Sequence, residues 1–428
     1  MVLAVWAGEI VLSSVPIFSY QVDYSLKADV FVAACLMAAT VTYLAARRPA
    51  RTPPPRYWRY EREVVVVQAL AVIGILGCLL LLADAATKGT SLSIFYLLEN
   101  LSVIRARVFE ENTDVFSGPL ALLGQSLAPC ALLAILAAAR IGRRNRMIVW
   151  LGVACFGLTA AVSLFVYGGR AQLFQAILLV VVSGYLGGRR LRVRPRTIVL
   201  AALLAGAAWF FSVTWYETRE GSAGNDKELI LLETQRATLH APFDAAVRDN
   251  PSVGSALISL GYFASPLPTL SFYTQQEPIP GPYWGGYSYP QAFSFAAHVA
   301  GAPYDWRNVR SEVFQPFDAA GYYPNVWATW LRDILVDFGY LGAVAFCALF
   351  AWAMAVFRNR YEATGALHYH MLEAISCFVF AFGAFTSYLW ASSITYAFLA
   401  ALGTLVAVRV TVSTPVHPRV ASPRSLGS

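Results

Sequence analysis

The segment Val64-Val-Val-Val-Gln-Ala-Leu-Ala-Val-Ile-Gly-Ile-Leu-Gly-Cys-Leu-Leu-Leu-Leu-Ala83 decides the fold class, because it runs for twenty residues without a charge. A helix of this length crosses the roughly 30 Å hydrocarbon core of a bilayer. Similar blocks recur along the chain of 428 residues, of which 57% are hydrophobic and only 13% charged. A soluble domain carries about 25% charged residues. The sequence therefore predicts an all-α, polytopic membrane helix bundle. It argues against a cytosolic enzyme, a secreted disulfide scaffold and a nucleic-acid-binding domain.

Apolar blocks separated by charged breaks predict about ten transmembrane helices. The first block carries Glu9 and Pro16, but it lacks the basic start and the small-residue cleavage site of a signal peptide, so we keep it as a span. The predicted spans are Leu3–Ser19, Ala28–Ala46, Val64–Ala83, Phe116–Ala139, Met147–Tyr167, Ala171–Gly188, Thr197–Trp215, Phe338–Phe357, Tyr369–Leu389 and Ala391–Val408.

The distribution of Lys and Arg among the loops predicts the orientation of the chain. Alternate loops and the tail hold 20 of the 32 basic residues, and these loops should face the cytoplasm by the positive-inside rule. Both termini are then cytoplasmic. The basic positions fall in Arg47 to Arg62, Arg140 to Arg146, Arg189 to Arg196, Arg358 with Arg360, and Arg409, Arg419 and Arg424.

The long segment between spans seven and eight predicts a large extracytoplasmic loop. We divide the chain into an N-terminal membrane bundle of seven spans (1–216), this loop (217–337), three C-terminal spans (338–412) and a cytoplasmic tail (413–428) that we expect to be disordered. Within the loop, the apolar stretch Pro251–Tyr273 is broken by Pro266 and Pro268. We predict a re-entrant or interfacial element there.

Cysteine and histidine usage predicts no metal and no cofactor. All six cysteines fall inside predicted spans, where Cys serves as a small packing residue. Of the five histidines, only His240 and His298 lie on the predicted outer side, far apart and without a paired ligand spacing. The chain also lacks a Gly-x-x-x-x-Gly-Lys phosphate-binding loop.

Charges at the outer membrane edge are the first candidates for function. Arg170 lies in a three-residue outer connection, where its guanidinium would bind a phosphate or extend to lipid headgroups. Arg332, Asp333 and Asp337 come just before the eighth span. Arg332 and Asp333 should diverge on a helix, whereas Asp333 and Asp337 share a face and would orient or deprotonate a hydroxyl. The alternative is a solvated helix start, where the helix dipole favours acids.

The large loop also combines aromatic rings with guanidinium groups. Its segments 282–290 and 305–310 contain Trp284, Tyr287, Trp306, Arg307 and Arg310. Sugars stack their C–H faces on such rings, and Arg binds phosphates and hydroxyls. The alternative is a packed loop with an interfacial aromatic belt.

These features together resemble bacterial oligosaccharide repeat-unit polymerases of the Wzy type, the O-antigen and exopolysaccharide polymerases. The resemblance rests on Gly168-Gly169-Arg170-Ala171 at an outer helix end, on the large late loop, and on Asp337-Phe338-Gly339-x-x-Gly342 at the start of a span. The spacing from Arg310 to Gly321 also matches a family pattern. The chain departs from the family where Ala171 replaces a trailing Gly.

The resemblance implies a glycosyltransferase of the bacterial inner membrane that uses undecaprenyl-diphosphate-linked glycans as donor and acceptor. A chain-length regulator and a flippase are the expected partners, besides membrane lipids. The implied substrate-binding residues are Arg170, Arg307, Arg310, Arg332, Trp284, Tyr287 and Trp306, and the implied catalytic residues are Asp333, Asp337 and His298.

Two other classes of protein compete with this interpretation. A ligase related to O-antigen ligases would share the span count and the outer loop but would transfer finished glycan to another acceptor. A polysaccharide or lipid transporter would require charges or broken helices within spans. The predicted spans are almost free of ionisable residues, which disfavours transport.

Overall fold

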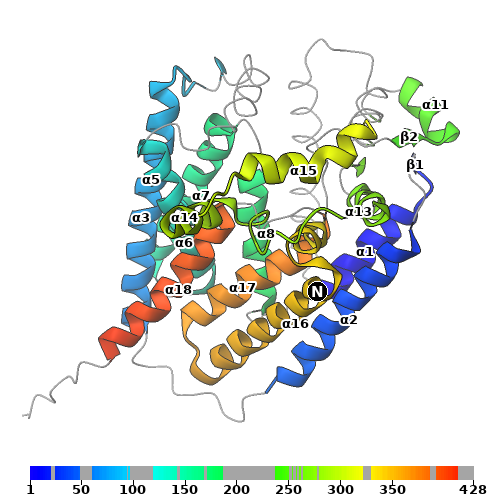
Figure 1. Cartoon of the computed structure of the whole chain (residues 1–428). Coiled ribbons are helices and arrows are strands. Elements are labelled where there is room, and N and C mark those ends of the chain that lie inside the picture. The colour runs from blue at the N-terminus through cyan, green and yellow to red at the C-terminus, as the bar shows by residue number, and fades with distance from the viewer. Residues whose placement is uncertain are drawn as a thin grey trace, which may run out of the picture.

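The computed structural model describes residues 1–20, 25–48, 60–93, 95–96, 119–141, 145–167, 171–186, 237–249, 253, 257, 260–261, 264–276, 279–321, 329–385 and 392–412. This part of the chain is mostly helical, as the sequence predicts (Figure 1). The helices are α1 (Val2–Ser14), α2 (Leu26–Ala46), α3 (Tyr60–Thr87), α5 (Pro119–Leu127), α6 (Pro129–Ile141), α7 (Arg146–Ala161), the π-helix η2 (Val162–Val166), α8 (Ala171–Leu186), α11 (Ala241–Asp249), α13 (Pro266–Gln275), α14 (Pro290–Ala300), α15 (Trp306–Ala319), α16 (Trp330–Thr364), α17 (Leu367–Phe382) and α18 (Ser392–Val412).

A short antiparallel pair of strands supplements the helices. Strand β1 (Phe18–Tyr20) follows α1, and β2 (Ala237–Leu239) pairs with it so that Ser19 lies opposite Thr238. This pairing ties the predicted outer loop to the end of the first predicted span.

Five helical segments are long and apolar enough to cross a membrane: α2, α3, α5 with α6, α7 with η2, and α16. The apolar helices α1, α8, α17 and α18 are shorter over the residues searched. Each of these segments overlaps a predicted span, although α16 begins before its span, and the span Thr197–Trp215 lies outside the described residues. The count of about ten spans and the large loop stay predictions.

Helix α2 shows the inside-out pattern expected of a lipid-facing helix. Its buried face carries small or aromatic residues such as Phe31 and Cys35, which pack on α16. Its exposed face is apolar and includes Leu26, Val30 and Met37. A contiguous apolar outer surface is unusual in soluble proteins but suits hydrocarbon.

Close helix packing explains two glycines of α3. A Cβ at Gly74 or Gly77 would overlap the backbone of Ala131 or Ala128, at the junction of α5 and α6. That junction is where Pro129 interrupts the predicted fourth span. Small residues let membrane helices approach closely.

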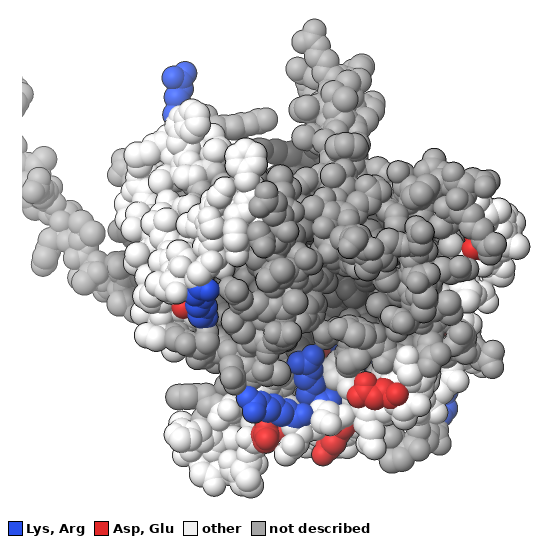
Figure 2. Space-filling model, turned by 90° about the horizontal axis from the view of Figure 1, so that it is seen from above, with Lys and Arg blue, Asp and Glu red and all other residues white. Residues whose placement is uncertain are grey.

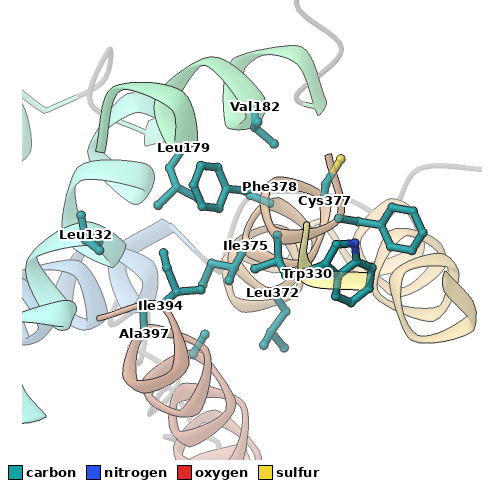
Figure 3. Close-up of a cluster of buried hydrophobic side chains, with 14 of the residues drawn as sticks. Leu132, Leu179, Val182, Trp330, Leu372, Ile375, Cys377, Phe378, Ile394 and Ala397 are labelled. Atoms are coloured by element: carbon teal, nitrogen blue, oxygen red, sulfur yellow. The ribbon is translucent and has the colours of Figure 1, made fainter. Parts of the chain in front are cut away.

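The hydrophobic core is centred on α17, which is buried almost along its whole length. Trp330 of α16 meets the rings of Phe346, Phe350 and Phe380 at centroid distances of 6.1, 5.5 and 5.0 Å. Figure 3 shows how α6, α8, α16 and α18 surround α17, through Leu132, Leu179, Val182, Trp330, Leu372, Ile375, Phe378, Ile394 and Ala397. All six cysteines are buried free thiols.

Polar contacts gather several helix ends at one end of the bundle. Asn359 of α16 donates to the Ala46 carbonyl of α2 at 2.8 Å and accepts from Arg47 at 2.8 Å. Arg358 donates to the Leu186 carbonyl that ends α8, at 2.6 Å. The alternation of basic loops requires the ends of α2, α8 and α16 to lie on one side of the membrane. That this side is cytoplasmic stays a prediction.

Helix α13 lies in the predicted re-entrant stretch. Pro266 and Pro268 lie in the first turn of this helix, which has no use for their missing N–H groups. A bend at Ser265 separates α13 from the helical residue Ala264 before it. Leu270 and Tyr273 are buried in the main core, and the Ser271 hydroxyl accepts the Ser25 amide at 2.6 Å. The described part of this stretch therefore packs into the bundle beside α1 and α2.

Candidate functional site

The site is built around a break in α16. Gly339 has φ 67° and ψ −179°, which separates a first segment, residues 330–338, from the long helix that follows. A break leaves carbonyl groups without helical partners. Here the Tyr283 amide donates to the Val336 carbonyl at 3.4 Å, and the Trp284 amide donates to the Asp337 carbonyl at 2.8 Å. We call residues 281–288 the strap, because they run across this break.

Asp337 anchors the other end of the strap. Its Oδ1 accepts the Tyr287 amide and its Oδ2 accepts the Ser288 amide, each at 2.9 Å. The residue is fully buried. A buried carboxylate needs such donors, and the backbone supplies one to each oxygen.

Arg332 and Asp333 form a buried ion pair. Arg332 donates to Asp333 Oδ1 through Nε at 3.0 Å and through Nη2 at 2.9 Å. The expected divergence of these neighbours is therefore wrong, because the long Arg332 side chain reaches the carboxylate of Asp333. Arg332 is 6% exposed and Asp333 is 0% exposed, so this is no solvated helix start.

Tyr287 joins the ion pair to the strap. Arg332 Nη2 donates to the Tyr287 hydroxyl at 3.1 Å, and its guanidinium lies 5.8 Å from the centre of that ring. Burial raises the pKa of Tyr287, although the positive charge of Arg332 opposes this shift. The phenol is therefore neutral at physiological pH. Its oxygen accepts the hydrogen bond from Arg332.

Helix α15 brings a second guanidinium to the site. The Arg310 guanidinium lies 5.5 Å from the Phe314 ring centre, and that of Arg332 lies 5.6 Å from the same centre. Arg310 also lies 5.5 Å from the centre of the Trp306 ring. Two cations thus share one aromatic ring, an arrangement that cation–π attraction favours despite their like charge.

Two tyrosine hydroxyls connect the strap to its neighbours. Tyr283 donates to Glu312 of α15 at 2.5 Å, and Tyr304 donates to the Gly286 carbonyl at 2.7 Å. Burial raises the pKa of Tyr304 to about 12. The strap, α15 and the start of α16 therefore form one connected unit.

The structure brings most of the predicted site residues together. Tyr287, Arg310, Arg332 and Asp333 are joined directly or through Phe314, with Trp306 and Asp337 at the edges of the group. Trp284 is 70% exposed, and Arg307 and His298 are also exposed. Among the described residues, no contact joins His298 to Arg332. Arg170 lies outside the described residues.

Sequence reasoning missed Phe314, Tyr283 and Glu312. Phe314 follows Trp306 and Arg310 at intervals of four residues, so all three share one face of a helix. That spacing was the available signal. The contact of Tyr283 with Glu312 joins separate elements, and no sequence pattern indicates it.

Figure 2 shows where charge gathers on one face of the molecule. Basic and acidic side chains lie together along the edge that α15 forms. This helix contributes Arg307, Arg310, Glu312 and Asp318. In the part of the chain that the structure describes, no group of three or more His, Cys, Asp or Glu residues is placed to hold a metal ion.

Comparison with known proteins identifies no relative of this chain. The chain matches no protein-family model, no curated protein and no solved structure. Its function must therefore be argued from the site itself.

Proposed function

We propose that the protein transfers glycans from a lipid diphosphate at the outer face of the bacterial inner membrane, joining undecaprenyl-diphosphate-linked repeat units into surface polysaccharide or exopolysaccharide. The observation that carries this proposal is the pair of guanidinium groups, Arg310 and Arg332, on one ring beside the buried carboxylate of Asp333. Guanidinium groups match phosphate oxygens in both charge and geometry.

The reaction needs little more than these groups. An acceptor hydroxyl attacks the anomeric carbon of the donor glycan, and the bond from that carbon to the diphosphate oxygen breaks. The lipid diphosphate leaves with the bonding electrons, and Arg310 and Arg332 neutralise the charge that develops on it. The proton of the acceptor hydroxyl passes to a base.

Asp333 is the better candidate for that base. Asp337 already accepts a backbone amide at each oxygen, and His298 stands apart on α14. Asp333 lies beside the cation that would hold the leaving group. Half-exposed Trp306 and exposed Trp284 are the rings available for sugar stacking.

The membrane setting supports the same proposal. A lipid-linked substrate reaches an enzyme from within the bilayer, and the site lies at the start of a helix that is long and apolar enough to span it. We place both termini in the cytoplasm, and we expect a flippase to supply the substrate and a chain-length regulator to act on the product. A ligase would use the same donor chemistry with a different acceptor.

A transporter is the second candidate, and one observation favours it. Glu9 of α1 and His370 and Glu373 of α17 are buried within apolar helices, which the sequence had suggested were almost free of ionisable groups. The packed rings around Trp330 lie on the same helices as Glu373 and Asp333. A dense aromatic core does not suit a polar path, so we rank transport second.

Deleting the gene in its native host tests the proposal. Profiling lipid-linked and surface glycans by mass should show single repeat units in place of long polymer. When expressed in the deletion strain, the Arg310→Ala variant should fail to restore polymer. The Arg360→Ala variant should restore it, because Arg360 is exposed and lies near the end of α16 that is far from Arg332. Full-length polymer retained on the lipid carrier would indicate a ligase. Unchanged glycans in the deletion strain would contradict both the polymerase and the ligase.

A further inference from the structure

We infer that Asp337 is a positioning residue that orients Arg332 through the strap and the Tyr287 hydroxyl. The inference rests on the proposed function, since it concerns the cation assigned there to the leaving diphosphate. It assigns Asp337 a different role from that of a proton acceptor.

The geometry defines a chain of three contacts. Asp337 holds the Tyr287 and Ser288 amides, which fixes the backbone of Tyr287. The Tyr287 ring then places its hydroxyl 3.1 Å from Arg332 Nη2. The same nitrogen donates to Asp333, so Tyr287 and Asp333 together set the plane of the guanidinium.

Burial makes each contact in this chain costly to lose. Asp337 and Tyr287 are 0% and 2% exposed, so water cannot replace a lost partner without entering the site. Arg332 Nη1 has no hydrogen-bond partner among the described residues. The orientation of the guanidinium decides where this remaining donor points.

Chemical labelling of Arg332 reads out its position without any substrate. We would treat the purified full-length protein with phenylglyoxal and follow the modification of Arg332 by peptide mass. The Arg332 side chain is 7% exposed, so wild-type labelling should be slow. Asp337→Asn keeps the size but places an NH₂ group against a backbone N–H. It should speed labelling about tenfold or more, since one hydrogen bond to a charged group is worth at least that factor.

Tyr287→Phe tests the second contact, because it leaves the strap backbone intact and removes only the hydroxyl. It should speed labelling to a similar extent. If Asp337 acts through Tyr287, the double variant should label no faster than the faster single variant. Asp318→Asn, the same chemical change at an exposed position of α15, should leave the rate at the wild-type value.

The outcomes separate positioning from general damage and from the proposed function. Unchanged labelling of Arg332 in Asp337→Asn or in Tyr287→Phe overturns the inference. It is also overturned if the double variant labels faster than either single variant, so that the two increases in rate multiply. Faster labelling of the distant Arg140, which donates to Tyr361, would reveal global unfolding and would also overturn it. Inorganic diphosphate should slow Arg332 labelling in the wild type. A lack of protection would contradict the proposed anion site, while the labelling comparison would still judge Asp337.

Discussion

The glycine at the start of the strap allows a sharp test of the site's architecture. Gly281 has φ +112°, and a Cβ there would overlap the carbonyl oxygen of Val336. Gly285 has φ +96° in the same strap, but a Cβ there would meet nothing within 4 Å. Gly281→Ala and Gly285→Ala therefore share the backbone strain and differ in the steric overlap.

The expected energies follow from these contacts. A side chain at positive φ costs about 1–2 kcal/mol, and Gly285→Ala should lose only this. In Gly281→Ala the strap must also move away from α16. This weakens the hydrogen bonds from Tyr283 to Val336 and from Trp284 to Asp337, and each loss costs about 1 kcal/mol. The total loss of local stability in Gly281→Ala is about 3–4 kcal/mol, so this variant should be less stable than Gly285→Ala by about 2 kcal/mol.

Hydrogen exchange measured by mass spectrometry on peptides from the strap is the direct assay. A difference of about 2 kcal/mol corresponds to an approximately 30-fold difference in local opening. Peptides from α3 should exchange at the wild-type rate in both variants. Equal strap exchange in the two variants would refute the close contact between the strap and the break in α16.

Three further predictions concern other parts of the molecule. Asn359→Ala removes three hydrogen bonds that hold the end of α2 and should lower stability by about 1.5–3 kcal/mol; an unchanged thermal midpoint in detergent would contradict this. Because burial raises the pKa of Tyr304 to about 12 in the folded state, the wild type should lose stability as pH rises from about 10 to 12. Tyr304→Phe should show a smaller loss in melting curves, because buried tyrosines such as Tyr287 still contribute to it. Arg170→Ala should abolish polymer although the protein still inserts into the membrane. Polymer of normal chain length in that variant would contradict a role for Arg170 in the site.

Helix positions were predictable because hydrophobic blocks dominate this sequence. The start predicted for the eighth span at Phe338 is one residue from the break at Gly339, since apolar sequence begins where the second part of α16 begins. The preceding turns, from Trp330, lie outside the predicted span, although we had interpreted Arg332, Asp333 and Asp337 as residues of a helix. Their buried charges do not match the composition of a span.

The candidate site was only partly predictable, because its contacts join segments that are distant in sequence. Arg332, Asp333 and Asp337 were found from their charges at a membrane edge. The spacing of Asp333 and Asp337 suggested one shared task, yet Asp333 binds Arg332 and Asp337 binds the strap. This division depends on a strap about fifty residues earlier in the chain, as the Tyr287–Asp337 contact shows.

The most direct test of the proposed function is a reaction with purified components. Lipid-linked repeat units extracted from the deletion strain would be incubated with the full-length protein in lipid nanodiscs, and the products would be separated by mass. The proposal predicts longer lipid-linked glycans, with one lipid diphosphate released for each new glycosidic bond. Unchanged repeat units and no released lipid diphosphate, from a protein that restores polymer in the deletion strain, would contradict it.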